Sequence, residues 1–401
     1  MPSPITSERG RIDACLRCGF RAFYSTLIFF SLHWAMVLYI NSSFLEHFFE
    51  TKTISMLYIV AALITMLGFF ISPTLLRHTG SIRLITTFTL TEMGALVTMA
   101  FTQTPLLALI AFLVHASVTP LILFSMDMLI ESMIGENEST TGSKRGIFLT
   151  IASGSLALSA LVMGFMIGNV SSDFTLAYLT ATILLLPFLF KLHYNFGAYQ
   201  DPHYTPFKVI ETLSVFWHNK DIRNVFFSNL LLQFFFAWMV IYTPVYLATE
   251  MNFNWEQIGI ILFSGLIAYV LLEYVIGYLA DTYFGEKEMM AIGFMVMAVS
   301  TSSFLFLPSG ALLLWMVTMF MTRVGAAFVE TTSESYFFKQ TGGSDARTIG
   351  VFRITQPLAY ILCPIAGSAL LYHLDFAFTF VVVGILLVLG LFFSMALRDT
   401  K

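Results

Sequence analysis

The chain has 401 residues, of which 57% are hydrophobic and 11% are charged, and its formal net charge is −4. A mean hydropathy of +0.81 excludes a soluble globular domain of this length. The charge pattern gives no indication of nucleic-acid binding, because no basic stripe with interleaved aromatic residues is present.

Twelve apolar stretches follow one another along the chain, and each is long enough, at about 20 residues, to cross a bilayer as a helix. They lie at residues 22–43, 54–74, 84–101, 105–131, 146–168, 174–192, 224–247, 258–280, 289–307, 311–337, 349–371 and 376–396. The first is a full span with no small-residue cleavage site after it, so we expect no cleavable signal peptide. The sequence therefore predicts an all-α integral membrane protein with twelve transmembrane helices.

The lysines and arginines lie almost entirely in even-numbered loops, on the side of the membrane that holds the N-terminus. Only Lys52 lies on the opposite side, and only Arg323 lies in the interior of a span, since Lys191 and Arg353 lie at the ends of theirs. Because positively charged loops stay in the cytoplasm, we expect both termini there, in a multi-pass protein of the plasma (cell inner) membrane.

A long polar stretch at residues 193–223 divides the spans into two sets of six, so we expect a cytoplasmic linker there. The remaining parts are a tail at 1–21, bundles at 22–192 and 224–396, and a tail at 397–401. The two sets align at a common offset of 203–204 residues, with Asp127 on Glu330, Glu131 on Glu334 and Gly146 on Gly350. Six spans is an even number, so the halves are parallel repeats, with substrate sites expected between them.

The run from Gly277 to Lys287 resembles the loop signature of the major facilitator superfamily, Gly-x-Leu-Ala-Asp-Arg-x-Gly-Arg-Lys. It lies between the second and third spans of the second half, where that signature belongs, and the resemblance extends to all twelve spans, the linker and the repeat. The run departs by one extra residue before Gly285 and by Thr282 in place of a basic residue. In the first half the copy is degraded, with Pro73 and Arg77 where glycine and aspartate would stand.

The resemblance implies a latch between the halves that is closed when the protein faces outward. Gly277 allows two helices to approach closely, and Asp281 can accept hydrogen bonds from a facing helix N-terminus and bind a cation. Arg145 and Arg347 are the candidate cations. The alternative is a loop aspartate satisfied by its own turn.

Ionisable groups inside the hydrocarbon are costly and are therefore functional candidates. Arg323, Glu330 and Glu334 share one stripe of span ten, with Arg323 near the midplane. We expect Arg323 to bind an anionic or polar group of the substrate, or to clamp an acidic side chain that releases it upon protonation. The alternative is a structural ion pair with Glu330 or with Glu92 or Glu273 from a neighbouring helix.

Two pairs of carboxylates, Asp127 with Glu131 and Glu330 with Glu334, are i,i+4 neighbours and share a helix face. We expect Glu131 and Glu334 to gate the cytoplasmic end through ion pairs, for which the available cations are Lys144, Arg145, Arg347 and Arg353. The proton-coupling candidates are Asp127, Glu330 and Glu273.

The resembled family lines its central cavity with the first, fourth, seventh and tenth helices, and the polar residues here follow that arrangement. The substrate-binding candidates are Arg323, Glu330, Asp127, His33, Trp34, Asn229, Gln233, Trp238 and Tyr242. Single histidines such as His33 and His115 are alternatively hydrogen-bonded packing groups, and no metal-ligand spacing is present. Cys15 and Cys18 lack the other half of a zinc site and are expected to be reduced thiols, so we expect neither metal nor cofactor.

The sequence thus predicts a secondary active transporter that moves a small solute by alternating access, coupled to a proton gradient and acting as a monomer in the lipid bilayer. One alternative is a non-transporting receptor or a lipid-moving protein on the same fold. The other is a polytopic membrane enzyme, although nucleotide-binding, HExxH and nucleophile-elbow motifs are absent. The sequence does not identify the substrate.

Overall fold

The computed structural model describes residues 4–38, 40–134, 140–170, 174–204, 209–341 and 345–398, and the helices dominate these ranges. The side chains of Cys15 and Cys18, and residues 399–401 of the predicted C-terminal tail, lie outside the described part. The helices are α1 (Pro4–Leu38), α2 (Asn41–Glu46), α3 (Thr51–Thr79), α4 (Ser81–Phe101), α5 (Pro105–Ile134), α6 (Thr141–Val170), α7 (Thr175–Phe196), α8 (Val209–His218), α9 (Lys220–Thr249), α10 (Trp255–Leu279), η2 (Ala280–Phe284), α11 (Glu286–Ser302), η3 (Ser303–Phe306), α12 (Leu312–Gln340), α13 (Ala346–Arg353), α14 (Thr355–His373) and α15 (Phe376–Met395).

Eleven helical segments in the described part are long and apolar enough to cross a membrane. They match the predicted spans in order, except that the fifth predicted span, 146–168, falls on α6, whose outer side chains are not described. The predicted all-helical, twelve-span class is confirmed. The predicted linker contains one short helix, α8.

Local sequence determines where several helices begin. Asn254 and Gln257 form a reciprocal capping box at the start of α10, and Asn219 caps α9 through the backbone N–H groups of Asp221 and Ile222. Gly80 and Gly285 adopt positive φ angles of 81° and 75°, which lets the chain reverse tightly before α4 and α11. These two turns occupy corresponding places in the two halves.

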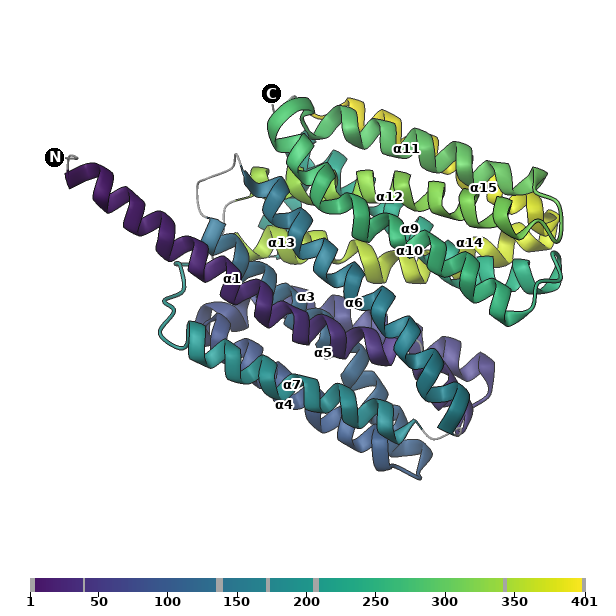
Figure 1. Ribbon diagram of the computed structural model, residues 1–401, viewed down its shortest axis with the longest axis horizontal. Coiled ribbons are helices and arrows are strands. Elements are labelled where there is room, and N and C mark those ends of the chain that lie inside the picture. Colours follow the sequence, from purple (N-terminus) through teal and green to yellow (C-terminus); the bar gives the residue numbers. More distant parts are fainter. Residues whose placement is uncertain are drawn as a thin grey trace.

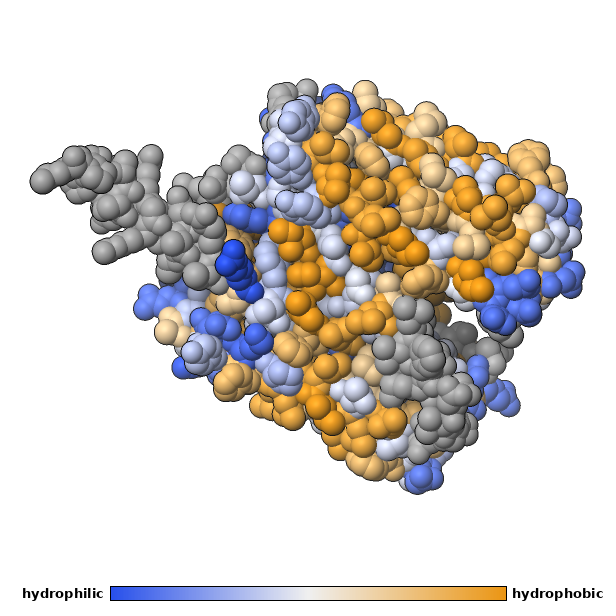
Figure 2. Space-filling view, in the orientation of Figure 1, coloured by the Kyte–Doolittle hydropathy of each residue, from blue (hydrophilic) through white to orange (hydrophobic). Residues whose placement is uncertain are grey.

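Both termini lie at the same end of the bundle, on the left of Figure 1, and we call this the inner end. Helices α1 to α5 and α7 pack mainly against one another or against α6, and most of α9 to α15 likewise pack within their own set, whereas α6 and α13 pack mainly against the opposite set. The two sets meet where α6 lies against α10 and α12, and where α3 lies against α13 and α14. In Figure 2 the apolar surface spans the middle of both sets, and hydrophilic residues gather at the two ends.

The repeat is visible in two close contacts between the halves. A Cβ atom on Gly146 would lie 2.7 Å from the carbonyl oxygen of Glu273, and one on Gly350 would lie 2.9 Å from that of Phe69. Gly350 follows Gly146, and Glu273 follows Phe69, by the same 204 residues. The same glycine-to-backbone contact is therefore made twice, once by each half, which confirms the parallel repeat.

The apolar core joins the halves at the inner end. The first half has a cluster of its own, to which each of the helices α1 to α7 contributes. Towards the inner end, Phe69 and Leu76 of α3 and Phe124 and Met128 of α5 belong to the large cluster of the second half. The inner end is thus packed shut.

The linker is attached to the first half through Asp201. This carboxylate accepts hydrogen bonds from the backbone N–H of Ser81, at 3.0 Å, and from the hydroxyl of Tyr204, at 2.7 Å. Burial raises the pKa of Tyr204, so its hydroxyl remains a donor at physiological pH. The linker therefore covers the α3–α4 turn, where the family signature is degraded.

Candidate functional site

Asp281 connects the two halves at the inner end. Its Oδ1 accepts the backbone N–H of Gly142 at 3.1 Å, and its Oδ2 accepts the backbone N–H and the hydroxyl of Ser143 at 2.7 and 2.9 Å. These donors belong to the first turn of α6, which carries unpaired N–H groups and a positive partial charge. The structure has the geometry expected for Asp281 and excludes the alternative of a carboxylate satisfied only by its own turn.

The extra residue before Gly285 is accommodated by a π-helical turn, η2, which contains Asp281. Gly277 lies one turn earlier, where a Cβ atom would come within 2.2 Å of the carbonyl oxygen of Gly142. The insertion and the glycine together bring the Asp281 carboxylate onto the end of α6.

The cation beside Asp281 differs from both candidates. It is Lys339 of α12, whose Nζ lies 3.1 Å from Asp281 Oδ1 and also pairs with Glu286. Arg347 instead pairs with Asp345 at 2.9 Å. Asp345 is the N-cap residue of α13, and Arg347 lies in the first turn of that helix. Arg145 points away from Asp281 towards the carboxylates of α5.

A second connection between the halves is an ion-pair cluster of three carboxylates and two arginines. Arg145 is fully buried and donates to Asp127 at 2.7 Å and to Glu131 at 3.0 Å. Arg353, from the other half, donates to Asp127 at 2.8 Å and to Glu334 at 3.0 Å. We call these five residues the inner cluster.

An aromatic ring from the other half also contacts the inner cluster. The guanidinium carbon of Arg145 lies 3.3 Å from the ring centroid of Phe338, which belongs to the other half. Glu131 and Glu334 form the ion pairs expected of them. Asp127 was also a candidate for substrate binding and proton coupling, but it is held between two guanidinium groups, which favours a gating role instead.

Arg323 is a buried cation without an ion pair in the described part of the chain. It is only 8% exposed, yet it makes no ion pair with any residue in the described ranges. Its guanidinium carbon lies 5.2 Å from the ring centroid of Phe235, and Gly265 leaves room for its aliphatic stem. Within the described part of the chain, Arg323 forms no ion pair with Glu330, Glu92 or Glu273, although its charge acts on Glu330.

Tyr269 lies within electrostatic reach of Arg323 and of two carboxylates. The charges of Arg323, Glu330 and Glu273 all act on the buried hydroxyl of Tyr269. Glu273 is fully buried at the contact between the halves, where its Oε1 accepts the hydroxyl of Ser153 of α6 at 3.0 Å and its Oε2 has no partner. The structure thus brings together three predicted site residues, with Tyr269 and Ser153 in addition. Neither addition carried a charge that would have marked it in the sequence.

The other substrate-binding candidates are dispersed. Asn229 is already engaged, because its Oδ1 accepts the hydroxyl of Thr355 at 2.7 Å. Trp238 and Tyr242 pack ring against ring at 4.5 Å, and Gln233 and Trp34 are partly buried. His33 is fully buried inside the first half against Glu92, so it does not lie beside Arg323.

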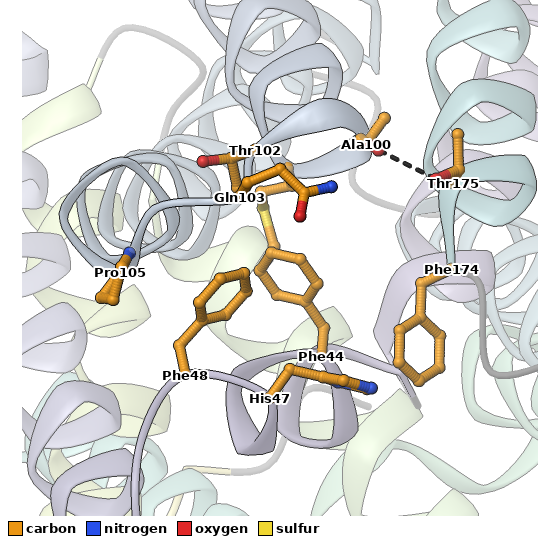
Figure 3. Close-up of a pocket in the computed structure, with 10 residues that line it drawn as sticks. Phe44, His47, Phe48, Ala100, Thr102, Gln103, Pro105, Phe174 and Thr175 are labelled. Carbon is orange, nitrogen blue, oxygen red and sulfur yellow. Dashed lines mark hydrogen bonds between the residues drawn. The ribbon is translucent and has the colours of Figure 1, made fainter.

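A hollow of about 540 Å³ opens at the outer end of the first half, away from Arg323 (Figure 3). Phe44 of α2, with His47 and Phe48 just after that helix, faces Gln103 and Phe174 across the hollow, and Thr175 closes one side by donating to Ala100. None of the predicted site residues lines this pocket.

The apolar helices, the paired halves and the charged residues between them are those of a multi-pass integral membrane protein. Residues 225–401 match the family model of the Major Facilitator Superfamily. The whole structure is similar to the crystal structure of the human organic anion transporter MFSD10 (TETRAN), with a TM-score of 0.72, 11% sequence identity, and coverage of 94% of this chain and 99% of that chain. No curated protein matches the chain in sequence. The family match covers the second half of the chain, and the structural likeness extends the same fold to both halves.

Proposed function

We propose that this protein is a secondary carrier for a small organic anion, which Arg323 binds near the membrane midplane. The observation that carries the proposal is a buried guanidinium with no carboxylate paired to it in the described part of the chain. A buried cation without a partner is costly, and an anionic ligand would remove that cost. The similar solved structure is described as an organic anion transporter, which agrees with this choice of substrate class.

Alternating access is supported by the two connections at the inner end. Asp281 with the first turn of α6, and Arg353 with Asp127, both join one half to the other. Opening this end requires both to separate, whereas Arg323 lies outward of them along α12. The inner end faces the cytoplasm by the positive-inside rule, so the described conformation is closed towards the cytoplasm.

Proton coupling is supported by two carboxyl groups in the region of Arg323. Glu273 is fully buried and has no cation partner in the described residues, so a negative charge there would be costly. Protonation of Glu330 would remove a negative charge that acts on Arg323, although the two form no ion pair, and so favour an anion beside Arg323. We therefore propose that an anion and a proton move together, in a monomeric carrier.

The test is ligand-induced thermal stabilisation of the purified protein, followed by uptake into proteoliposomes. Benzoate, succinate and methanesulfonate serve as anions, with neutral sugars and an alkyl amine for comparison. An anion present at 100 times its Kd stabilises the folded state by about 2.7 kcal/mol. We expect this stabilisation in the wild type and in Arg323→Lys, and a loss of at least tenfold in affinity in Arg323→Gln.

Arg347→Gln is the matched control, because it removes the same charge from a pair near the inner end. A response to neutral sugars alone, or an unchanged anion response in Arg323→Gln, contradicts the role of Arg323. Uptake that a protonophore abolishes supports the coupled carrier. Binding without flux would favour the receptor or lipid-moving alternative, and turnover of an added acyl donor without flux would favour an enzyme.

A further inference from the structure

Five buried side chains form a hydrogen-bonded chain inside the first half, and none of them touches the Arg323 region. They are Tyr178 of α7, Asn41 of α2, His115 of α5, Glu92 of α4 and His33 of α1, each at most 6% exposed. Glu92 Oε1 lies 2.6 Å from His115 Nδ1 and 3.1 Å from His33 Nε2. Its Oε2 has no partner, so a negative charge on Glu92 would be stabilised through one oxygen only.

The contacts of His33 determine how many protons it shares with Glu92. Its Nδ1 lies 2.9 Å from the carbonyl oxygen of Phe30, which can only accept, so Nδ1 must carry a proton. Its Nε2 faces Glu92 Oε1, and a contact between a nitrogen lone pair and a carboxylate would be repulsive. One further proton must therefore lie between them, either on Nε2 or on the carboxyl group.

The other members of the chain orient this pair. The hydroxyl of Tyr178 donates to Asn41 Oδ1 at 3.1 Å, which turns Asn41 Nδ2 towards His115 Nε2 at the same distance. Because an amide nitrogen only donates, His115 Nε2 accepts, and its proton lies on Nδ1, directed at Glu92. His115 is thus a neutral donor, and the shared proton belongs to His33 and Glu92.

We propose that His33 and Glu92 form a proton-binding site inside the first half, oriented by His115, Asn41 and Tyr178 and separate from the Arg323 region. Bound, the proton holds α1 against α4. Released, it leaves a lone pair facing a carboxylate, which weakens the contact between these helices. The proposal does not depend on the nature of the transported solute.

The surroundings of the pair contain few other titratable groups. Tyr58 of α3 interacts with Tyr178, and Lys191 of α7 donates to Ser25, farther towards the inner end. At the outer end of this row of hydrogen-bonded side chains, the ring of Phe44 packs edge-on against Tyr178, with ring centroids 5.2 Å apart. Phe44 also lines the outer pocket (Figure 3). The ring of Phe44 thus contacts both Tyr178 and the pocket, so we place the exchange route for the proton on the outer side.

The test is nitrogen NMR of histidine-labelled protein in lipid nanodiscs between pH 6 and pH 9, with signals assigned through His33→Gln. We expect His33 to keep a proton on Nδ1 throughout and to lose the proton of its Nε2–Glu92 contact in one step. Glu92→Gln supplies an uncharged amide in place of the carboxyl group and should abolish that step. Glu46→Gln makes the same charge change on an exposed residue of α2 and should leave it intact.

The Tm provides a second measurement. Because loss of the proton would leave the His33 Nε2 lone pair facing the Glu92 carboxylate in the folded state, we expect stability to fall as the pH rises through the step. The wild type, Glu46→Gln and Arg323→Gln should show this fall in Tm, and Glu92→Gln should not. A wild-type His33 whose only proton is on Nε2, or an equal fall in Glu92→Gln, overturns the proposal. If Glu92→Gln does not fold, His33→Gln should likewise lack the fall in Tm, and its persistence there overturns the proposal.

Discussion

At the scale of single residues, the buried arginines have different surroundings and therefore different expected roles. Arg145 and Arg353 are each bonded to two carboxylates, and removing one member of such a cluster leaves an uncompensated charge, at a cost of about 3–5 kcal/mol. Arg323 has no such partner among the described residues. Substitutions at the first two should act on stability and conformation, and at Arg323 on ligand binding.

Substitution of Asp281 tests directly whether its hydrogen bonds to α6 hold the inner end closed. Asp281→Ala removes three hydrogen bonds to a charged acceptor and should weaken the closed inner end by on the order of 2 kcal/mol. Spin labels at His78 and Tyr283, both exposed at the inner end, report the separation of the halves in a cysteine-free background. We expect a longer distance population in the variant.

Asp345→Ala is the control for this measurement, since Asp345 caps α13 within its own half. It should leave the label distance unchanged. An unaltered distance in Asp281→Ala would show that the latch does not hold the inner end closed.

At the scale of the elements, the contact between α6 and α10 depends on glycine residues in both helices. Gly142, Gly146 and Gly277 each lie against the backbone of the other half, at separations that leave no room for a side chain. This close approach lets a single carboxylate on η2 reach two successive N–H groups of α6. The same geometry presents Glu273 to Ser153, about two turns farther out.

Gly277→Ala should therefore separate the two helices at the inner end. Its Cβ would lie 2.2 Å from the carbonyl oxygen of Gly142, and overpacking of this kind costs about 1–3 kcal/mol. Gly154→Ala is the matched change on α6, because nothing lies within 4 Å of its Cβ. We expect a lower Tm and a longer label distance for Gly277→Ala only, and equal Tm values for the two variants would contradict the close contact.

At the scale of the whole molecule, the two halves share a fold but differ at the inner end. The second half contributes Asp281 to the latch, whereas the corresponding Arg77 in the first half is exposed and the linker residue Asp201 covers the adjacent turn. The first half instead contains the His33–Glu92 pair, and the second contains Arg323. The repeat thus supplies one scaffold with two different buried polar sites.

The orientation of the molecule can be tested by labelling intact cells with a membrane-impermeant maleimide. We expect Glu50→Cys, in the loop between α2 and α3, to react from outside, and His203→Cys, in the linker, to react only after permeabilisation. Both positions are exposed, so access decides the outcome. The reverse pattern would place the termini outside and overturn the positive-inside assignment.

Much of the architecture follows from the sequence because its causes are local. Hydrophobic length determines the spans, and the alternation of Lys and Arg supports their number. The common offset of the halves predicts the repeat that Gly146 and Gly350 display. The run around Asp281 predicts its contact with a helix N-terminus, since the spacing from Gly277 positions the carboxylate at a helix end.

The partners of the charged residues depended on the tertiary structure. Lys339 rather than Arg145 or Arg347 lies beside Asp281, and Arg353 reaches Asp127 from the other half. The meeting of His33 with Glu92 and His115 likewise involves three helices. Sequence periodicity gives the face of a helix on which a charge lies, but not the rotation and depth of the helices around it. Those are set by close packing over the whole bundle, so only the assembled structure decides which charges are paired and that Arg323 is not.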